Sequence, residues 1–273
     1  MKVLIVASGS RGNAAIFEAG GTRVLVDAGV GPRVIARAIE AGGIGGPPHA
    51  IVITHAHDDH LGHAQKLARK LDVPVWVSEA TARVARLTEA PRVRVFGARE
   101  PFAIGAITIA PLPIPHDAAQ VSLVVEGGGL RAGIATDLGE VPPGLADHLA
   151  ACEVLLLESN HDPELLSRGP YPAHLKRRIA SARGHLSNQQ AHAFLRELSP
   201  RTHTVVLMHL SGTNNAASIA LEVARDALAG RAVTLHAASQ STPLLLDAAA
   251  PPPVALPGAP PGARGAVDQL RLF

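Results

Sequence analysis

Short apolar runs separated by turn-forming residues predict a series of strands. The run at 2–7 (KVLIVA) comes first, and the runs at 15–19 and 22–26 flank Gly20-Gly21, a pair typical of a hairpin turn. Further runs of the same kind predict strands at 50–54, 73–77, 104–110, 121–126, 133–136, 154–157 and 205–208.

Helical spacing of apolar residues appears between these strands. It predicts helices at 32–41, 61–71, 79–87, 187–198 and 215–228. Gly42-Gly43 ends the first helix, and Ser187 with Gln190 forms a predicted capping box at the start of the fourth. Strands come early and mix with helices later, so the pattern predicts an α+β fold in which two packed sheets carry helices on their outer faces.

Composition narrows the class of protein. The chain has 273 residues and one cysteine, Cys152, so no internal disulfide can form and a reducing cytoplasm is expected. Seven aromatic residues (five Phe, one Trp and one Tyr) are too few for a surface of stacked bases, and the net charge of +2 implies no acidic partner by itself. No apolar stretch approaches the roughly 18 residues of a membrane span. The N-terminus predicts a strand instead of a signal peptide, and we expect no membrane partner.

The composition changes at residue 250. Residues 250–268 contain six prolines and three glycines without an apolar period, which predicts a linker. The linker would join a globular catalytic domain at 1–249 to a terminal peptide at 269–273.

A histidine-rich segment follows the strand predicted at 50–54. Its sequence, HAHDDH at 55–60, places three imidazoles and two carboxylates within six residues, with alternate side chains on one side of an extended loop. Such mixed ligands suit zinc, manganese or iron, and the alternative is a solvated histidine-rich turn. His116, Asp137 and His209 each end an apolar run, where a sheet edge could present them to the same site.

These residues resemble the metal-binding motif of the metallo-β-lactamase superfamily, over roughly residues 1–245. The resemblance implies a four-layer αβ/βα sandwich with two divalent metal ions, Zn or Mn, at one edge. It assigns one ion to His55, His57 and His116 and the other to Asp59, His60 and His209, with Asp137 bridging them and Asp27 orienting the cluster from behind. Two such ions lower the pKa of a shared water and stabilise charge on the attacked group, which makes Asp59 a catalytic residue as well.

Four loop motifs resemble a narrower group, the WalJ/YycJ branch, whose characterised members are DNA exonucleases. They are SGSRGN at 8–13, ESNHD at 158–162, GHLSN at 184–188 and HLSGTNN at 209–215. Their layout is also similar to that of the tRNA-processing ribonuclease Z group. The resemblance implies a 5′-to-3′ DNA exonuclease in repair.

Polar side chains in and near these motifs suit a phosphodiester substrate. Hydroxyl and amide groups can bind phosphate oxygens, and basic side chains can neutralise backbone charge. The substrate-binding candidates are Ser8, Ser10, Asn13, Lys176, Arg177, Ser187, Ser211 and Asn214. Lys176 and Arg177 could instead form a solvated helix face.

Three residues of these motifs have predicted supporting roles. His185 is expected to protonate the leaving oxygen, and Glu158 to orient His185 or the attacking water. His161 is expected behind the metal ligands. A helix cap for His185 and a structural carboxylate for Glu158 are the alternatives.

The last five residues resemble the short peptide by which bacterial DNA-processing proteins bind the sliding clamp. Gln269 would fix the orientation, and Leu270, Leu272 and Phe273 would fill an apolar pocket. The alternative is an apolar tail that packs back on the domain.

The sequence therefore predicts a two-metal phosphodiesterase that acts on DNA. An RNA-processing nuclease of the same fold remains open, as does a small-molecule ester or thioester hydrolase, which would need neither the tail nor the basic segment. A non-catalytic binding protein is a third class, against which the complete ligand set counts.

Overall fold

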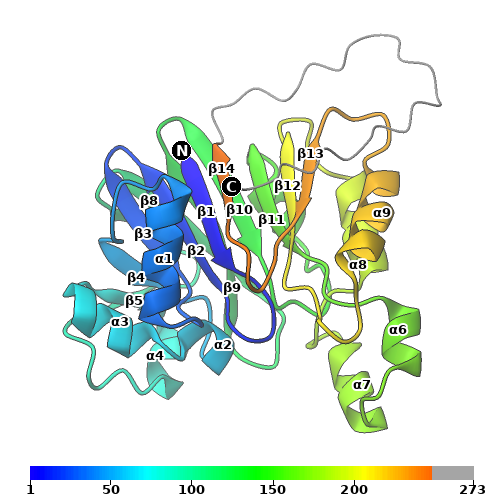
Figure 1. The fold of residues 1–273 in the computed structure, drawn as a ribbon, viewed down its shortest axis with the longest axis horizontal. Coiled ribbons are helices and arrows are strands. Elements are labelled where there is room, and N and C mark those ends of the chain that lie inside the picture. The colour runs from blue at the N-terminus through cyan, green and yellow to red at the C-terminus, as the bar shows by residue number, and fades with distance from the viewer. Residues whose placement is uncertain (248–273) are drawn as a thin grey trace, which may run out of the picture.

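Two seven-stranded sheets pack face to face in the computed structural model, which describes residues 1–247 (Figure 1). The first sheet has the order β14 (Leu244–Asp247), β1 (Lys2–Ala7), β2 (Ala14–Ala19), β3 (Thr22–Val26), β4 (Ala50–Val52), β5 (Val75–Ser78) and β6 (Val93–Phe96). The second has the order β13 (Thr234–Ala237), β12 (Thr204–Met208), β11 (Val154–Glu158), β10 (Leu130–Ala135), β9 (Gln120–Gly127), β8 (Ile107–Ile114) and β7 (Phe102–Ile104).

Each sheet has an antiparallel half and a parallel half. In the first sheet the pairs from β14 to β3 are antiparallel and those from β3 to β6 are parallel. The second sheet repeats this arrangement, antiparallel from β7 to β10 and parallel from β10 to β13. Neighbouring parallel strands end at the same edge, which is where α/β sheets hold their ligands.

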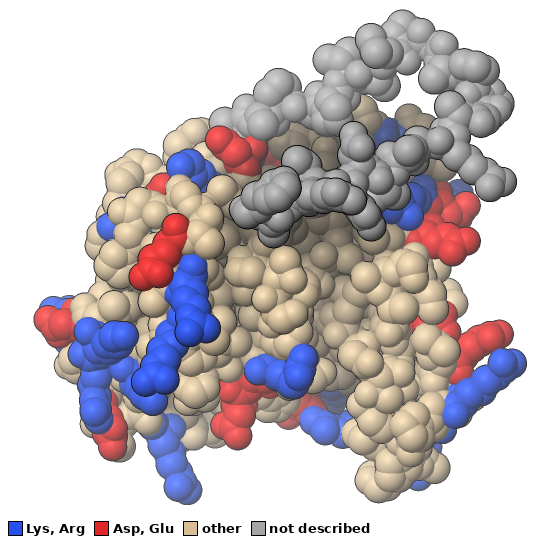
Figure 2. Space-filling model, viewed as in Figure 1, with Lys and Arg blue, Asp and Glu red and all other residues tan. Residues whose placement is uncertain are grey.

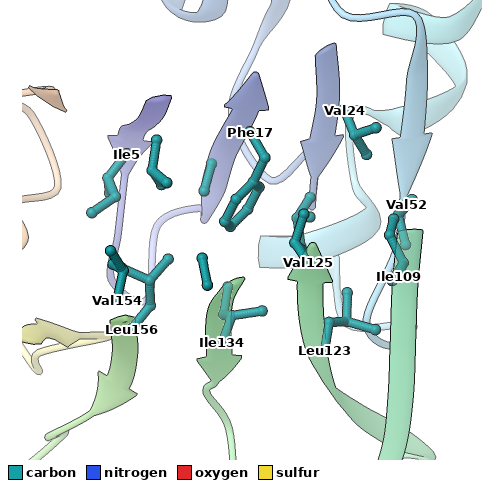
Figure 3. Close-up of a cluster of buried hydrophobic side chains, with 14 of the residues drawn as sticks. Ile5, Phe17, Val24, Val52, Ile109, Leu123, Val125, Ile134, Val154 and Leu156 are labelled. Atoms are coloured by element: carbon teal, nitrogen blue, oxygen red, sulfur yellow. The ribbon is translucent and has the colours of Figure 1, made fainter. Parts of the chain in front are cut away.

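The main core lies between the two sheets (Figure 3). Strand β9 shows how it forms, because Val121, Leu123 and Val125 face the first sheet while Val124 packs on the outer side among the helices. In β1, Val3 and Ile5 belong to the same central core. Strands buried on both faces need apolar residues at every position, which accounts for the uninterrupted apolar runs in the sequence.

Helices cover both outer faces. Against the first sheet pack α1 (Pro32–Gly42), α3 (Ala64–Leu71) and α4 (Glu79–Val84), and against the second α5 (Leu145–Leu149), α8 (Asn188–Arg196) and α9 (Ala217–Ala227). The predicted four-layer α+β sandwich is therefore confirmed. Two short helices, α6 (Pro163–Arg168) and α7 (Ala173–Ile179), project from the body in Figure 1, and α7 has no buried residue.

Several predicted boundaries are wrong. The helix predicted at 61–71 is two helices, α2 (Asp58–Leu61) and α3, separated at Gly62-His63. The strand predicted at 104–110 is a hairpin, since Gly105 has a φ of 56° and turns the chain between β7 and β8. The pattern also missed β6, β13 and β14, which have four residues each. No helix within residues 1–247 is both long and apolar enough to cross a membrane.

Candidate metal centre

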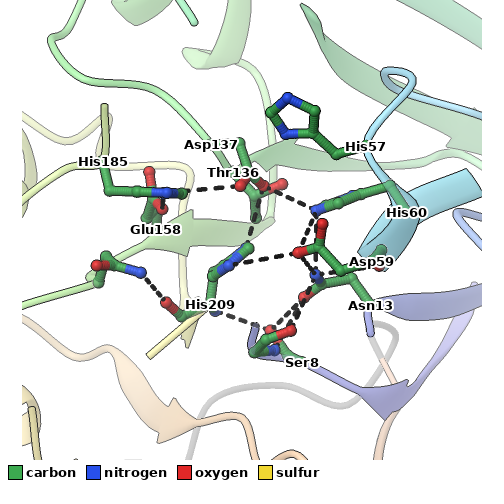
Figure 4. A network of polar contacts seen from close by, with 12 residues as sticks. Ser8, Asn13, His57, Asp59, His60, Thr136, Asp137, Glu158, His185 and His209 are labelled. Carbon is green, nitrogen blue, oxygen red and sulfur yellow. Dashed lines mark hydrogen bonds and ion pairs between the residues drawn. The ribbon is translucent and has the colours of Figure 1, made fainter. Parts of the chain in front are cut away.

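The predicted ligands come together at one end of the sandwich, where strands of both sheets end (Figure 4). Strand β4 leads to His55, β10 to Asp137 and β12 directly to His209. His116 follows β8 by two residues, and Asp59 and His60 lie in α2, whose first turn favours acidic side chains. Segments far apart in the sequence thus supply one cluster.

Three histidines form a first group of potential ligands. His55, His57 and His116 each offer a ring nitrogen within 4.8 Å of the others, and His57 Nδ1 lies 3.3 Å from His116 Nε2. The buried Nε2 of His55 has no hydrogen-bond partner among residues 1–247. Burial lowers the pKa of His55 well below its usual value, and the neighbouring His60 lowers it further. The ring is therefore neutral and can present a lone pair.

A second group combines two carboxylates with two imidazoles. Asp59, His60, Asp137 and His209 offer ligand atoms within 4.8 Å of one another. Asp137 Oδ2 lies 3.1 Å from both His60 Nε2 and His209 Nδ1. Burial raises the pKa of Asp137, but the adjacent His209 and His60 outweigh it and hold the pKa well below its usual value. The carboxylate stays ionised in the interior, which suits it to a cation.

Asp27 supports this group from behind, at the end of β3. Its Oδ2 lies 2.7 Å from His60 Nδ1, and its Oδ1 accepts hydrogen bonds from the Thr54 backbone nitrogen at 2.9 Å and hydroxyl at 3.0 Å. Burial lowers the pKa of His60, but Asp137 and Asp27 outweigh it and raise the pKa well above its usual value. A carboxylate behind a ligating imidazole fixes the ring orientation and the nitrogen that carries the proton.

The loop at 8–13 contacts the same group. The Ser8 hydroxyl accepts a 2.8 Å hydrogen bond from the backbone nitrogen of His209. Asn13 Nδ2 lies 3.0 Å from His60 Nε2 and 3.4 Å from Asp59 Oδ2. Both residues are buried, so their polar atoms contact predicted ligands and not the open site.

His185 and Glu158 form a hydrogen-bonded pair beside Asp137. His185 Nδ1 lies 2.8 Å from Glu158 Oε1 and 3.6 Å from Asp137 Oδ1. The other oxygen of Glu158 accepts hydrogen bonds from the backbone nitrogens of Leu138 and Leu186. Burial lowers the pKa of His185, but the attraction of Glu158 outweighs it and raises the pKa to about 9. His185 is therefore protonated at neutral pH.

Several predicted substrate residues are engaged within the protein. The Ser187 hydroxyl caps α8 as the predicted capping box, which is confirmed. The Ser211 hydroxyl accepts a hydrogen bond from the backbone nitrogen of Asn214, and the buried side-chain amide of Asn214 has no partner. Ser10 is exposed.

The basic pair lies on α7. Lys176 donates a 2.7 Å hydrogen bond to the Ser167 carbonyl, whereas Arg177 is exposed. His161 makes no hydrogen bond to the seven predicted ligands, and burial lowers its pKa to about 4.

Two residues of the centre escaped prediction. Thr54 joins Asp27 to the ligand loop, as described above. Asp117 Oδ1 lies 3.1 Å from His57 Nε2, and Arg178 donates a 2.8 Å hydrogen bond from Nε to the other oxygen of Asp117. Asp117 directly follows a predicted ligand, which is the one signal that could have identified it.

The donor set fits divalent metal ions. A buried imidazole nitrogen without a partner is unfavourable, and among residues 1–247 His55 Nε2 is of this kind, grouped with ring nitrogens of His57 and His116. Imidazole and carboxylate ligands are those of zinc, manganese and iron sites. Together with the packed sheets, this cluster defines a metal-dependent hydrolase of the metallo-β-lactamase fold.

Comparisons with known proteins agree with this class. Residues 22–210 match the β-lactamase superfamily domain. The chain is 32% identical over 228 residues to exodeoxyribonuclease WalJ of Streptococcus pneumoniae serotype 2, covering 80% of this chain and 85% of the relative. It is 30% identical over 223 residues to exodeoxyribonuclease YycJ of Bacillus anthracis, covering 79% and 84%. The structure of YhfI from Bacillus subtilis superposes with a TM-score of 0.68 at 16% identity, covering 89% and 98%, which shows the shared fold. The chain therefore belongs to the metallo-β-lactamase superfamily and, within it, to the WalJ/YycJ family.

Proposed function

We propose that the protein is a two-metal DNA exonuclease that degrades a strand from its 5′ end. His55, His57 and His116 would hold one ion, and Asp59, His60 and His209 the other. Asp137 would lie between the two ions, because its charge acts on His55 and His116 as well as on its hydrogen-bond partners. Asp27, Ser8 and Asn13 would position these ligands through the contacts described above. For Ser8 and Asn13 this replaces the substrate role expected from the sequence.

When bound, two such ions activate a water molecule and stabilise charge on the attacked phosphate. The protein's own groups supply the proton transfer. His185 carries a proton beside Asp137, and Glu158 holds its Nδ1, which leaves Nε2 free to donate to the leaving oxygen. The pair therefore has the geometry of a general acid and its orienting carboxylate.

The substrate proposal depends on the relatives and on the loops around the centre. Both relatives bear the name exodeoxyribonuclease. Arg177 is exposed on α7 for contact with backbone phosphates, and Ser10 and Ser211 line a cleft beside His209. Figure 2 shows Lys and Arg mixed with Asp and Glu at the margins of one face and little charge at its middle. We infer that cations near the centre, such as the exposed Arg177, would contact the strand.

One observation carries this proposal: two adjacent groups of buried and half-buried potential ligands at the edge where both sheets end. The test uses DNA labelled at the 5′ or the 3′ end, single- and double-stranded, with matched RNA, and compares zinc with manganese. We expect stepwise loss of nucleotides from the 5′ end of DNA, abolished by EDTA. Faster cleavage of RNA would favour the RNA-processing alternative, and absence of cleavage under all conditions would contradict a nuclease.

A matched pair of variants makes the test specific for the site. Asp59→Ala removes a ligand and should abolish cleavage. Asp58→Ala removes the neighbouring carboxylate, which is exposed and makes no side-chain contact within residues 1–247, and should retain activity. Undiminished cleavage by Asp59→Ala would contradict the two-metal mechanism.

We also propose that the terminal peptide binds the bacterial sliding clamp and that the protein works in the cytoplasm in DNA repair. Gln269, Leu270, Leu272 and Phe273 lie outside the described residues, so the sequence pattern alone supports the clamp proposal. Deleting 269–273 should abolish capture by immobilised clamp and leave cleavage of free DNA unchanged. Equal capture of the deleted and full-length proteins would contradict this proposal.

A further inference from the structure

A cleft of about 660 Å³ opens beside His209. Its volume is within the roughly 300–1,000 Å³ of small-molecule sites. The lining includes Ser10, Arg11, Tyr171, Ser211, Thr213 and Gln240, and it includes no acidic side chain. The cleft is therefore suited to an anionic group with polar surroundings.

The loop that carries Arg11 connects this cleft to the metal centre. At one end of the loop, Ser8 holds the backbone nitrogen of His209. At the other end, the Asn13 backbone nitrogen donates a 2.8 Å hydrogen bond to the carbonyl of Asp59. The Arg11 Cα lies within about 7 Å of the Asn13 Cα, since each residue spans at most about 3.6 Å. The cleft therefore shares a loop with two contacts to the metal centre, one to His209 and one to Asp59.

Gln240 holds this loop in one conformation. The Arg11 backbone nitrogen donates to Gln240 Oε1 at 2.9 Å, and Gln240 Nε2 donates to the Gly12 carbonyl at 2.9 Å. Gly12 has a φ of 132°, and a Cβ there would lie 2.3 Å from the Gly29 carbonyl oxygen, so the turn requires glycine. A loop that is already ordered loses little conformational entropy on binding a ligand.

The Arg11 side chain has no partner of its own. Its guanidinium forms no hydrogen bond or ion pair with any residue from 1 to 247, whereas Arg178 is paired with Asp117 and Lys176 with the Ser167 carbonyl. A guanidinium matches the geometry of phosphate oxygens. The hydroxyls of Ser10 and Thr213 line the same cleft.

Tyr171 gives the cleft a second kind of surface. It is the chain's single tyrosine and lies between α6 and α7. Its ring offers a face for one base, and stacking of this kind is tolerant of sequence. A cation, hydroxyls and one aromatic ring are together the groups that bind a nucleotide.

We propose that this cleft receives the terminal nucleotide of the strand and that Arg11 binds its 5′-phosphate. Gln240 is a positioning residue that keeps the Arg11 loop in place. The inference rests on the proposed nuclease function and adds a preference for phosphorylated ends. The same guanidinium could instead contact an internal phosphate, which the experiment distinguishes.

The experiment compares two oligodeoxynucleotides that differ only in a 5′-phosphate or 5′-hydroxyl, with a 3′ fluorophore. The readout is the ratio of the two kcat/KM values for the full-length, metal-loaded protein. We expect the wild type to favour the phosphate by about 10- to 100-fold, the range of a charge-assisted hydrogen bond. Arg11→Gln should bring the ratio close to one and leave cleavage of the 5′-hydroxyl strand within about twofold, because that strand lacks the group that Arg11 binds. Gln240→Ala should lower the ratio to an intermediate value.

Arg37→Gln is the matched control. Arg37 is exposed on α1, and its substitution removes the same charge as Arg11→Gln does. It should leave the ratio unchanged. A wild-type ratio near one, or equal loss on both strands in Arg11→Gln, would overturn the inference. If the wild type cleaves neither strand, the result contradicts the proposed nuclease function and does not test the binding of the 5′-phosphate. In that case, fluorescence anisotropy in EDTA measures the affinity of the protein for the 5′-phosphate strand and for the 5′-hydroxyl strand. Equal affinity for the two strands would overturn the inference that the cleft binds a terminal phosphate.

Discussion

Replacing Asp27 with asparagine should weaken metal binding without unfolding the protein. In the wild type, one oxygen of Asp27 accepts hydrogen bonds from Thr54 and the other lies 2.7 Å from His60 Nδ1. An asparagine that keeps its oxygen toward Thr54 presents its NH₂ group to His60. The ring must then accept at Nδ1 and carry its proton on Nε2, the nitrogen that faces Asp137. The lone pair needed for a metal ion is lost.

The structure sets the size of this effect. Loss of a carboxylate behind a ligating histidine costs about 10- to 100-fold in metal affinity, or about 1.4–2.7 kcal/mol. The backbone should contribute little, because Asp27 has a φ of 61° and asparagine tolerates that conformation as aspartate does. Alanine would add strain of about 1–2 kcal/mol, so it is the poorer probe.

Competition with a chromogenic chelator measures the affinity for zinc and manganese, and circular dichroism checks the fold. Asp58→Asn is the matched control, since its exposed side chain makes no contact among residues 1–247. An Asp27→Asn protein that is folded and binds both metals within twofold of the wild type would refute the role assigned to this carboxylate.

Four further predictions concern the core, the metal centre and the acid. Leu123→Ala, fully buried between the sheets, should cost about 2–5 kcal/mol in urea unfolding, and a loss below 1 kcal/mol would contradict the proposed packing. Metal binding at pH 7 should release protons, because the raised pKa of His60 keeps it protonated until an ion displaces the proton; a binding enthalpy that is independent of the buffer would contradict this. In the metal-free protein, the His60 ion pairs should stabilise the fold fully below the unfolded-state pKa of about 6.5, and this contribution should be lost as pH rises through the higher folded-state pKa. Glu158→Gln should move the alkaline limb of the kcat/KM profile to lower pH by about 1–3 units, because His185 loses the carboxylate that raises its pKa to about 9; an unmoved limb would argue against His185 as the acid.

The sheets were predictable because burial on both faces leaves a strong signal in the sequence. Strands β1 and β9 are buried at nearly every position, and both lie inside a sheet. Strands β13 and β14 are four-residue edges with mostly half-buried or exposed residues, so each leaves only a short pattern in the sequence. An edge strand forms by pairing with a strand that is distant in the sequence, and a local sequence pattern does not predict that pairing.

The metal ligands were predictable because several of them cluster in one segment. The roles of the serine side chains were harder to predict. The sequence alone cannot show whether a serine faces substrate or the protein interior. Ser8 is engaged by the His209 backbone, whereas Ser10 in the same loop is exposed in the cleft. The long-range fold decides between these outcomes, and so the contacts of Gln240 with the loop of Arg11 were also not predicted.

Left-handed backbone at three residues turns the chain where strands of both sheets end at the centre. Asp27, Asp137 and His209 have φ values of 61°, 57° and 53° at the ends of β3, β10 and β12. This conformation costs a non-glycine residue about 1–2 kcal/mol, least for aspartate. Hydrogen bonds offset the cost, since Ser8 and Asn160 hold the backbone nitrogen and carbonyl of His209 at 2.8 Å each. These contacts fix where the His209 side chain leaves β12, beside Asp137 and Asp59.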